Sequence, residues 1–250
     1  ADVYNDKIQY VKTYTKDLEV AKMIEKYDLY EIPVVDELLR LVGVITVDDV
    51  IDVIREEADE NYQLAAGIVQ NVDSDDSIWK LTKARLPWLL IGMFGGLGAA
   101  GIMNGFQESM GKFLILLSFV PLIQSTAGNV GIQSSAIVVQ GLANGSIKGS
   151  LFSGLGKEFI LGLLNGLGIA FFVFLISHFV FNAPYLVSLT ICIALITVIV
   201  NAAIVGSAIP LMLHSRGLDP AVSTGPFITT SNDILGILIY FSIAKFILGF

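Results

Sequence analysis

A single carboxylate lies deep within an apolar stretch near the end of the chain. Asp233 follows the polar segment Thr229–Asn232 in a run that is otherwise free of charge up to Lys245. An ionisable side chain at membrane depth is costly, so it marks a functional site by default. An intramembrane aspartyl protease would need a second carboxylate facing the first. Because the uncharged runs hold no such partner and no Ser–His arrangement, the sequence predicts ion binding and no enzyme.

Oxygen ligands of another kind gather in the segment 121–133, PLIQSTAGNVGIQ. This segment is too polar and glycine-rich to face lipid, so we expect a break near Gly128 and Asn129 that lines a water-filled cavity or is covered by protein. Glycine exposes backbone carbonyls, and Asn129 and Gln133 add amide oxygens. Together with Asp233, these are the hard ligands that Mg²⁺ takes directly or through retained waters.

Five apolar helices must position these residues. Crossing ~30 Å of hydrocarbon takes about 20 apolar helical residues, and the uncharged runs Leu86–Gln107, Phe113–Ile147 and Phe159–Leu213 are long enough. The third run holds two spans, divided by the turn-forming Asn182–Pro184. The sequence therefore predicts an all-α bundle of five membrane helices over 86–250, with the spans at about 86–107, 113–142, 156–181, 185–213 and 226–250.

Charge separates the chain into two parts. Residues 1–85 hold 19 acidic and 10 basic side chains, whereas residues 86–250 hold 4 and 5. The acidic balance argues against a nucleic-acid partner, which attracts clustered Lys and Arg. Cys192 is the only cysteine, so disulfides within the chain and cysteine metal clusters are excluded. The polar opening lacks the pattern of a secretory signal, and we expect the chain to be part of a longer protein.

Basic residues predict the orientation, because positive side chains near span ends are retained in the cytosol. With the acidic head in the cytosol, five spans leave the C-terminus outside and only Lys112 and Lys245 on or near the outer side. The cytosolic basic residues would then be Lys80, Lys83, Arg85, Lys148, Lys157 and Arg216.

Glycines in the first span predict close helix packing. Gly92 and Gly96, like Gly101 and Gly105, are spaced four apart, which lets another helix approach that face. We expect a dimer or a tight bundle.

The acidic head reads as a small α/β unit over residues 1–60. Apolar residues recur with helical spacing over 18–27, β-branched runs at 32–35 and 41–46 predict strands, and a second helix is expected from Val47 to about Asn61. Residues 61–85 connect this head to the first span.

The segments YEIPVVD (30–36) and RLVGVIT (40–46), followed by Asp48-Asp49-Val50, closely resemble a cystathionine β-synthase (CBS) domain. Such domains usually work in pairs, so the resemblance implies a first copy upstream. Leu39 stands where the hairpin often has glycine, and we expect the turn to use another geometry. Thr46 and Asp49 leave two alternatives open: a helix N-cap, or a site for the ribose of ATP.

The CBS pattern, the two polar membrane segments and the five spans together are similar to the MgtE family of magnesium channels. The resemblance implies a homodimer in the lipid bilayer of the cell membrane, with Mg²⁺ passing near the two-fold axis for uptake. It assigns the essential pore carboxylate to Asp233, pore-lining groups to Gly128 and Asn129, and positions near the ion to Gly225 and Thr229. Ile132 and Gly225 stand where some relatives have Asn, so selectivity for Mg²⁺ over Co²⁺ and other divalent cations stays open.

The resemblance also implies a sensor in the acidic head. Asp49, Asp52 and Glu56 share one helix face, and a hard divalent cation is bound by carboxylates. In the family, cytosolic Mg²⁺ bridges such carboxylates to a connecting plug helix, here within 61–85, and holds the pore shut. The residues assigned to this regulatory metal are Asp36, Asp49, Asp52, Glu57 and Glu60.

Two rival functions remain. Chloride channels and cyclin-M-like transporters place their CBS domains after the membrane part, whereas here the CBS pattern precedes it. A membrane receptor or scaffold that transports nothing would not require the segment around Gly128 and Asn129, or Asp233.

Overall fold

The computed structural model describes residues 8–146, 151–223 and 225–250. Within the described residues, the N-terminal unit, residues 1–62, consists of a three-stranded sheet and two helices. Strand β2 (Glu31–Val35) pairs in parallel with the two-residue β1 (Val11–Lys12) and antiparallel with β3 (Leu41–Thr46). The helices are α1 (Asp17–Tyr27) and α2 (Val47–Ala65), the second of which ends just past the unit boundary.

The core of this unit follows from the apolar spacing of its elements. Helix α1 buries Val20, Ala21 and Ile24, and the spacing of Ile24 four and three residues after the other two puts all three on one face, which packs with Ile32 and Val50. The two strands and two helices that the sequence predicts are all present. Strand β1 was not predicted, because two residues carry no periodicity.

The β2–β3 hairpin corrects the expectation for Leu39. This residue itself adopts the left-handed conformation, with φ of 59°, that glycine would supply. The Asp36 carboxylate holds the turn, since its Oδ1 accepts hydrogen bonds from the backbone N–H groups of Leu38 (2.9 Å) and Arg40 (2.8 Å). Side-chain hydrogen bonds of this kind satisfy the turn's backbone and offset the cost of a positive φ.

The second unit, residues 63–250, contains five helices that are long and apolar enough to cross a membrane, among the residues that the structure describes. They belong to α3 (Ile78–Met110), α4 (Val120–Ala143), α5 (Leu151–Leu175), α6 (Tyr185–Ser215) and α7 (Pro226–Leu248). Shorter helical stretches are the 3₁₀ segments η1 (Gly111–Phe119) and η3 (Pro220–Ser223) and the π-helical turn η2 (Ile176–Val180). The expected fold class, a five-helix membrane bundle after a small α/β domain, is confirmed.

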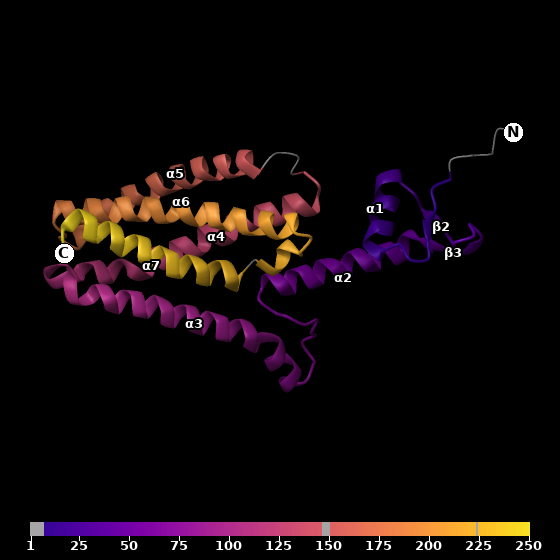
Figure 1. Cartoon of the computed structure of the whole chain (residues 1–250), viewed down its shortest axis with the longest axis horizontal. Helices are drawn as coiled ribbons and strands as arrows, with labels where there is room; N and C mark the ends of the chain where they lie inside the picture. Colours follow the sequence, from indigo (N-terminus) through magenta and orange to yellow (C-terminus); the bar gives the residue numbers. More distant parts are fainter. Residues whose placement is uncertain (1–7, 147–150, 224) are drawn as a thin grey trace. The chain divides into compact units, whose positions relative to one another are not determined.

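Helix α6 is the centre of the bundle. It packs against α4, α5 and α7, while α3 packs on the far side of α7 (Figure 1). Ile191, Leu195 and Ile199 of α6 are fully buried, as are Tyr240 and Phe241 of α7. The turn expected between the third and fourth spans is present, with Asn182 at φ of 52° and Pro184 as the N-cap of α6.

The structure differs from the sequence-based helix boundaries in two places. Helix α3 begins at Ile78, eight residues before the expected Leu86, because Ser77 caps it by accepting a hydrogen bond from the backbone N–H of Lys80. Residues 66–77 contain no helix, so the connecting region 61–85 consists of the end of α2, a non-helical link over 66–77 and the start of α3.

The expected break at Gly128 and Asn129 is wrong. Helix α4 runs through both residues, and the irregularity lies earlier, in η1, where Phe113 has non-helical backbone angles. Pro121 lies in the first turn of α4, where its missing N–H costs nothing. Glycine is tolerated further along because neighbouring helices approach there.

Candidate functional site: two polar cavities beside α4

Three of the six predicted pore residues line one cavity of about 740 Å³, here called the inner cavity. Asp233 and Thr229 reach it from the first turns of α7, and Gly225 from the residue before that helix. Asp233 and Thr229 are half-buried. The remaining lining residues are Ala65, Ala66, Gly67, Ile68, Arg85, Trp88, Leu89, Gly92, Ile132, Pro226 and Thr230.

Gly225 fixes the start of α7 in a strained geometry. Its φ is 61°, which L-residues rarely adopt, and a Cβ atom there would collide with the carbonyl oxygen of Ala65. Thr229 closes the first turn, since its Oγ1 donates to the Gly225 carbonyl at 2.9 Å. The Thr229 methyl group faces Gly128 across the α4–α7 contact, 3.1 Å from where a Gly128 Cβ would be. Gly128 is therefore a close-packing residue, with its backbone held inside α4.

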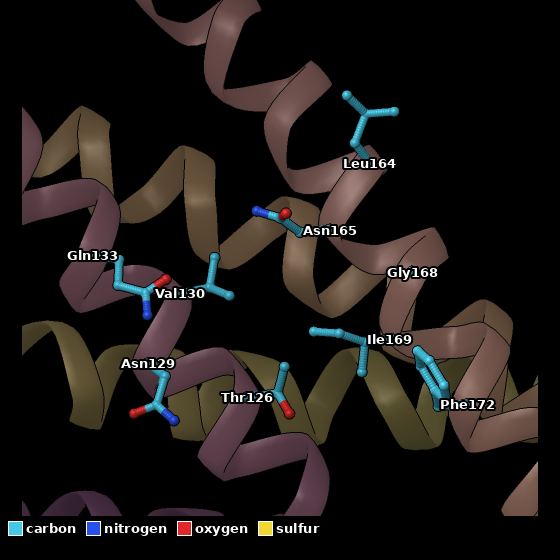
Figure 2. A pocket seen from close by; sticks show the side chains of 9 residues that line it. All are labelled: Thr126, Asn129, Val130, Gln133, Leu164, Asn165, Gly168, Ile169 and Phe172. Atoms are coloured by element: carbon cyan, nitrogen blue, oxygen red, sulfur yellow. The ribbon is translucent and has the colours of Figure 1, made fainter.

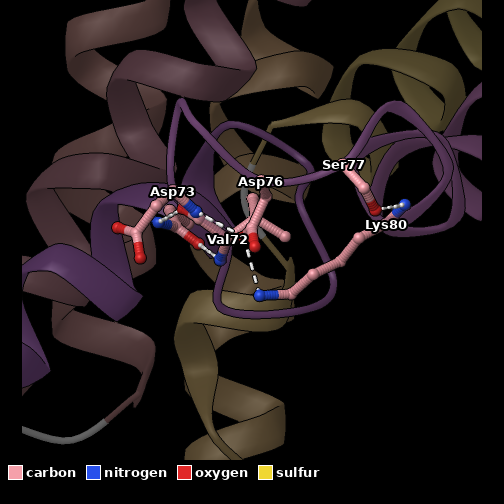
Figure 3. Close-up of polar contacts among 6 residues, drawn as sticks. Val72, Asp73, Asp76, Ser77 and Lys80 are labelled. Atoms are coloured by element: carbon pink, nitrogen blue, oxygen red, sulfur yellow. Dashed lines mark hydrogen bonds and ion pairs between the residues drawn. The ribbon is translucent and has the colours of Figure 1, made fainter.

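The connecting region forms a wall of the inner cavity through Ala65–Ile68. Figure 3 shows the polar contacts that hold this region in place. The Gln63 amide donates to the Val72 carbonyl (2.9 Å) and accepts from its N–H (3.2 Å). Asp76 accepts from the backbone N–H of Asp73 and pairs with Lys80 at 2.6 Å, and the Lys80 ammonium thereby lowers the pKa of Asp76.

Arg85, which was expected only as one of the cytosolic basic residues, also lines the inner cavity. It lines the same space as Asp233, and no salt bridge joins the two among the described residues. The cavity thus holds one carboxylate and one guanidinium. Nothing in the local sequence signals this, because Arg85 and Asp233 lie far apart in the chain and reach the same cavity only through the packing of α3 against α7.

The two amide side chains among the predicted pore residues lie in a different cavity. Asn129 and Gln133 line a groove of about 560 Å³ between α4 and α5, here called the α4–α5 groove. Figure 2 shows both helices and the side chains between them, including Asn165 of α5, which the sequence analysis did not single out. The other lining residues are Thr126, Val130, Leu164, Gly168, Ile169 and Phe172.

A second acidic side chain is buried in the membrane unit, contrary to the expectation that Asp233 is alone. Glu158 of α5 is only 8% exposed and accepts a hydrogen bond of 2.7 Å from the Ser134 hydroxyl of α4. It was missed because the sequence places it at the edge of an uncharged run. Asp233 lines the inner cavity, whereas Glu158 is not among the lining residues of that cavity.

Asn232, next to Asp233, is also buried, at 1% exposure. Its Nδ2 donates to the Ala127 carbonyl of α4 at 3.4 Å, and its side chain fills the space over Gly131. This contact fixes the first turns of α7 against the middle of α4.

The acidic residues of the head remain separate in the structure. Asp36 pairs with Arg40 at 2.7 Å, and hydrogen bonds from Arg40 and Leu38 lower its pKa. Asp52, Glu57 and Glu60 are exposed along α2. Among the described residues, no three carboxylate, imidazole or thiol groups lie close enough to hold a metal ion. The regulatory metal site therefore stays a prediction.

Thr46 and Asp49 form a helix cap. The Asp49 carboxylate accepts from the backbone N–H (3.1 Å) and the hydroxyl (2.8 Å) of Thr46, which lowers the pKa of Asp49. The direction of this bond is the reverse of the one expected, in which the Thr46 hydroxyl accepts. The ribose alternative stays untested.

Comparison with known proteins assigns both units. Residues 120–243, from the start of α4 to most of α7, match the MgtE family, described as a divalent cation transporter, and residues 1–56 match the CBS domain. A protein of Bacillus subtilis (strain 168) named "Magnesium transporter MgtE" is 36% identical over 227 residues, which cover 90% of this chain and 50% of the relative.

Two further proteins with that name are similar over nearly the whole chain. The one from Enterococcus faecalis is 37% identical over 98% of this chain and 54% of its own length, and the one from Thermus thermophilus is 35% identical over 99% and 55%. The chain thus spans about half the length of the curated relatives it matches.

Proposed function

This chain belongs to the MgtE family of divalent cation transporters, and from that premise we propose that it carries Mg²⁺ into the cell along a path that includes Asp233. The observation that carries the proposal is the half-buried Asp233 carboxylate, which lines the inner cavity beside Thr229 and Gly225. Of the described residues that line that cavity, it is the only acidic one. The relatives named as magnesium transporters support Mg²⁺ as the ion.

Asp233 would act by offsetting the desolvation of the ion. Mg²⁺ sheds water reluctantly, so a partly hydrated ion suits a wide cavity with one carboxylate and hydroxyl and carbonyl oxygens. Entry is driven by the membrane potential at about 2.3 kcal/mol per elementary charge per 100 mV, which doubles for a divalent ion.

We place the chain in the cell membrane as a homodimer, with the head in the cytosol and Phe250 outside. Exposed cations at Lys83, Arg85 and Arg216 support this orientation, since positive residues stay on the cytosolic side. Lys148, which the same rule assigns to the cytosol, lies outside the described residues. Gly92 and Gly96 lie on one side of α3 and Gly101 and Gly105 on the opposite side, and all four have open space where a Cβ would lie, so each pair leaves room for the close approach of another helix, as a dimer requires.

We further propose that cytosolic Mg²⁺ regulates transport by binding to the acidic head. The ion would bridge Asp36, Asp49 and the carboxylates of α2, namely Asp52, Glu57 and Glu60, to acidic partners near the connecting region. Loss of Mg²⁺ would then let like charges repel and pull on Ala65–Ile68, which wall the inner cavity. Binding of ATP at Thr46 and Asp49 belongs to the same regulatory proposal.

Two alternatives set the limits of the proposal. A broader divalent transporter that also passes Co²⁺ would use the same residues, because amide and carboxylate oxygens discriminate weakly between such ions. A receptor or scaffold that transports nothing would leave Asp233 without a role.

Reconstitution in liposomes tests the transport proposal. Mg²⁺ influx is recorded with a trapped indicator for the wild type, for Asp233→Asn and for Glu108→Gln, after size exclusion confirms the same oligomeric state. Glu108 is an exposed acid on α3, so its variant controls for the loss of one negative charge. Influx in the wild type and in Glu108→Gln, with loss in Asp233→Asn, is the expected result.

Equal influx in all three proteins would remove Asp233 from the path, and no influx in any of them would favour the receptor or scaffold.

Limited proteolysis with and without millimolar Mg²⁺ tests regulation separately. We expect Mg²⁺ to protect the head and the connecting region, and an unchanged cleavage pattern would overturn the sensor role.

A further inference from the structure

The α4–α5 groove presents uncovered amides at membrane depth. Asn129 and Asn165 are exposed, and each lies near the middle of its candidate span, Phe113–Ala143 or Gly154–Val180. Gln133, one turn further along α4, is also exposed, and none of these three side chains has a hydrogen bond of its own among the described residues. An amide that faces hydrocarbon without a partner costs several kcal/mol. The groove is therefore built to hold water or a polar ligand.

A buried carboxylate lies two helical turns from Asn165. Glu158 precedes Asn165 by seven residues, so both lie on the same face of α5. The hydrogen bond from Ser134 shows that this face meets α4, one residue beyond Gln133. Among the described residues, no Lys or Arg lies within salt-bridge distance of Glu158. A buried carboxylate needs a cation or several donors to offset its desolvation, and within the described part of the chain the Ser134 hydroxyl is the one donor to Glu158.

The two cavities open on neighbouring sides of α4. Ile132 lines the inner cavity, whereas its chain neighbour Gln133 lines the α4–α5 groove. Consecutive helix residues point about a quarter-turn or slightly more apart, so one helix separates the groove from the space that holds Asp233. An ion path past α4 can therefore include both the inner cavity and the α4–α5 groove.

We propose that the α4–α5 groove is a second binding site for a hydrated divalent cation, at which Asn165 and Gln133 contact the ion through its water shell and Glu158 supplies negative charge. This inference rests on the proposed transport function. Carboxamide oxygens accept hydrogen bonds from metal-bound waters, and Mg²⁺ usually keeps several of its waters in protein sites. The volume of the groove, about 560 Å³, accommodates an ion with its water shell.

Four variants separate ion binding from helix packing. Glu158→Gln removes the charge and keeps a group that can bond Ser134, whereas Ser134→Ala removes the bond and keeps the charge. Asn165→Leu removes the amide from the groove, and Asn104→Leu makes the same change at an exposed position on α3 outside it. The measurement is Mg²⁺ influx into liposomes as a function of external Mg²⁺, with Asp233→Asn measured in parallel.

Glu158→Gln and Asn165→Leu are expected to raise the half-saturating Mg²⁺ concentration about tenfold, the equivalent of one charge-assisted hydrogen bond. Ser134→Ala and Asn104→Leu should leave it unchanged. A role in packing alone would lower the maximal influx, through loss of folded protein, without moving the half-saturating concentration.

Three results would overturn the inference. Wild-type half-saturation in both Glu158→Gln and Asn165→Leu, with influx abolished by Asp233→Asn, would reject the groove site and leave the transport function intact. Conversion of Asn165→Leu from dimer to monomer on size exclusion, with unchanged half-saturation, would make the groove a subunit contact. If the wild type transports no Mg²⁺, the number of bound Mn²⁺ ions is measured instead, by Mn²⁺ titration in detergent followed by electron paramagnetic resonance. Equal numbers of Mn²⁺ sites in Glu158→Gln and Ser134→Ala would reject the groove site.

Discussion

The backbone of Gly206 in α6 lies directly against the backbone of Gly131 in α4. A Cβ atom on Gly206 would come within 2.9 Å of the Gly131 Cα and would collide with its carbonyl oxygen. On its other side, Gly131 is covered by Ile228 and Asn232 of α7. Three helices therefore meet at one glycine, one turn along α4 from Gly128 and Ala127, and this crossing holds α7 in place beside the inner cavity.

Gly206→Ala is expected to destabilise the membrane unit by about 1–3 kcal/mol, because the added methyl group meets backbone that cannot move aside without separating α4 from α6. The thermal midpoint of the detergent-solubilised protein, read by size-exclusion chromatography after heating, measures this. Gly105→Ala, which adds the same methyl group to α3 in open space, should leave the midpoint unchanged. Equal midpoints for both variants would contradict the close contact.

Tyr240→Phe should cost about 1–2 kcal/mol of stability. The Tyr240 hydroxyl is fully buried and donates to the Leu116 carbonyl of η1 at 3.0 Å. Its loss leaves a buried carbonyl of an irregular segment without that partner. The same heating assay detects the change, and Tyr185→Phe, at an exposed ring, provides the control. A midpoint no lower than that of the control would argue against the bond.

Gly225→Ala tests the contact between the connecting region and the start of α7. Gly217 has a comparable positive φ, 74° against 61°, but open space around it. Gly217→Ala should therefore show only the backbone strain, roughly 1–3 kcal/mol. Gly225→Ala should in addition displace Ala65, seen as faster hydrogen exchange over residues 65–72. Identical exchange in the two variants would mean that the Ala65 contact does not hold the connecting region.

Arg85→Gln should increase Mg²⁺ influx severalfold under the proposed function. The substitution removes a positive charge from the cavity that also holds Asp233, and like charges repel a cation that enters it. Lys83→Gln serves as the control, because the Lys83 ammonium lies over the Trp79 ring, 5.4 Å from its centroid, and Lys83 does not line the cavity. Influx that falls in Arg85→Gln would instead make Arg85 a structural partner of the path.

Acid should loosen the β2–β3 hairpin through Asp36. Hydrogen bonds from Arg40 and Leu38 depress the pKa of Asp36 in the folded state below its ordinary value of 3.8. The carboxylate therefore contributes stability that is present above that ordinary value and is lost as the pH falls through the depressed folded pKa. Asp36→Asn should remove this contribution at neutral pH and flatten the pH dependence.

Protection factors from hydrogen exchange, which correct for the intrinsic effect of pH, measure this over residues 31–46. Glu37→Gln, at an exposed neighbouring position, should keep the wild-type pH profile. A profile for Asp36→Asn as steep as that of the wild type would show that another group titrates.

Much of the fold could be predicted from local patterns. The β-branched runs of the head predicted strands β2 and β3 to within a residue, and the uncharged runs predicted the five apolar helices. The boundaries failed where a local cap overrode hydropathy, as at Ser77, which starts α3 well before the apolar run. The expected break at Gly128 was wrong because glycine weakens a helix only when nothing packs against it. Here Thr229 packs against Gly128, and α6 and α7 pack against Gly131.

The residues of the candidate site could be predicted from the sequence, but not which of them line the same cavity. Asp233, Gly225 and Thr229 share a cavity, whereas Asn129 and Gln133 face a separate groove. Sequence reasoning could assign each residue to the membrane unit, because hydropathy and charge are properties of a segment. It could not tell which side of α4 each would face, or that Arg85 and Glu158 belong beside these residues.

The amino-acid sequence by itself determined the acidic head, the apolar helices and the chemistry available to an ion, because these depend on the composition and spacing of neighbouring residues. The tertiary structure alone decided that Arg85 and Asp233 line one cavity, that the face of α5 with Asn165 and Glu158 is directed at α4, and that Gly131 meets Gly206. Each of these depends on how helices distant in the chain pack, and packing is set by the shapes of whole faces. No single segment carries that information.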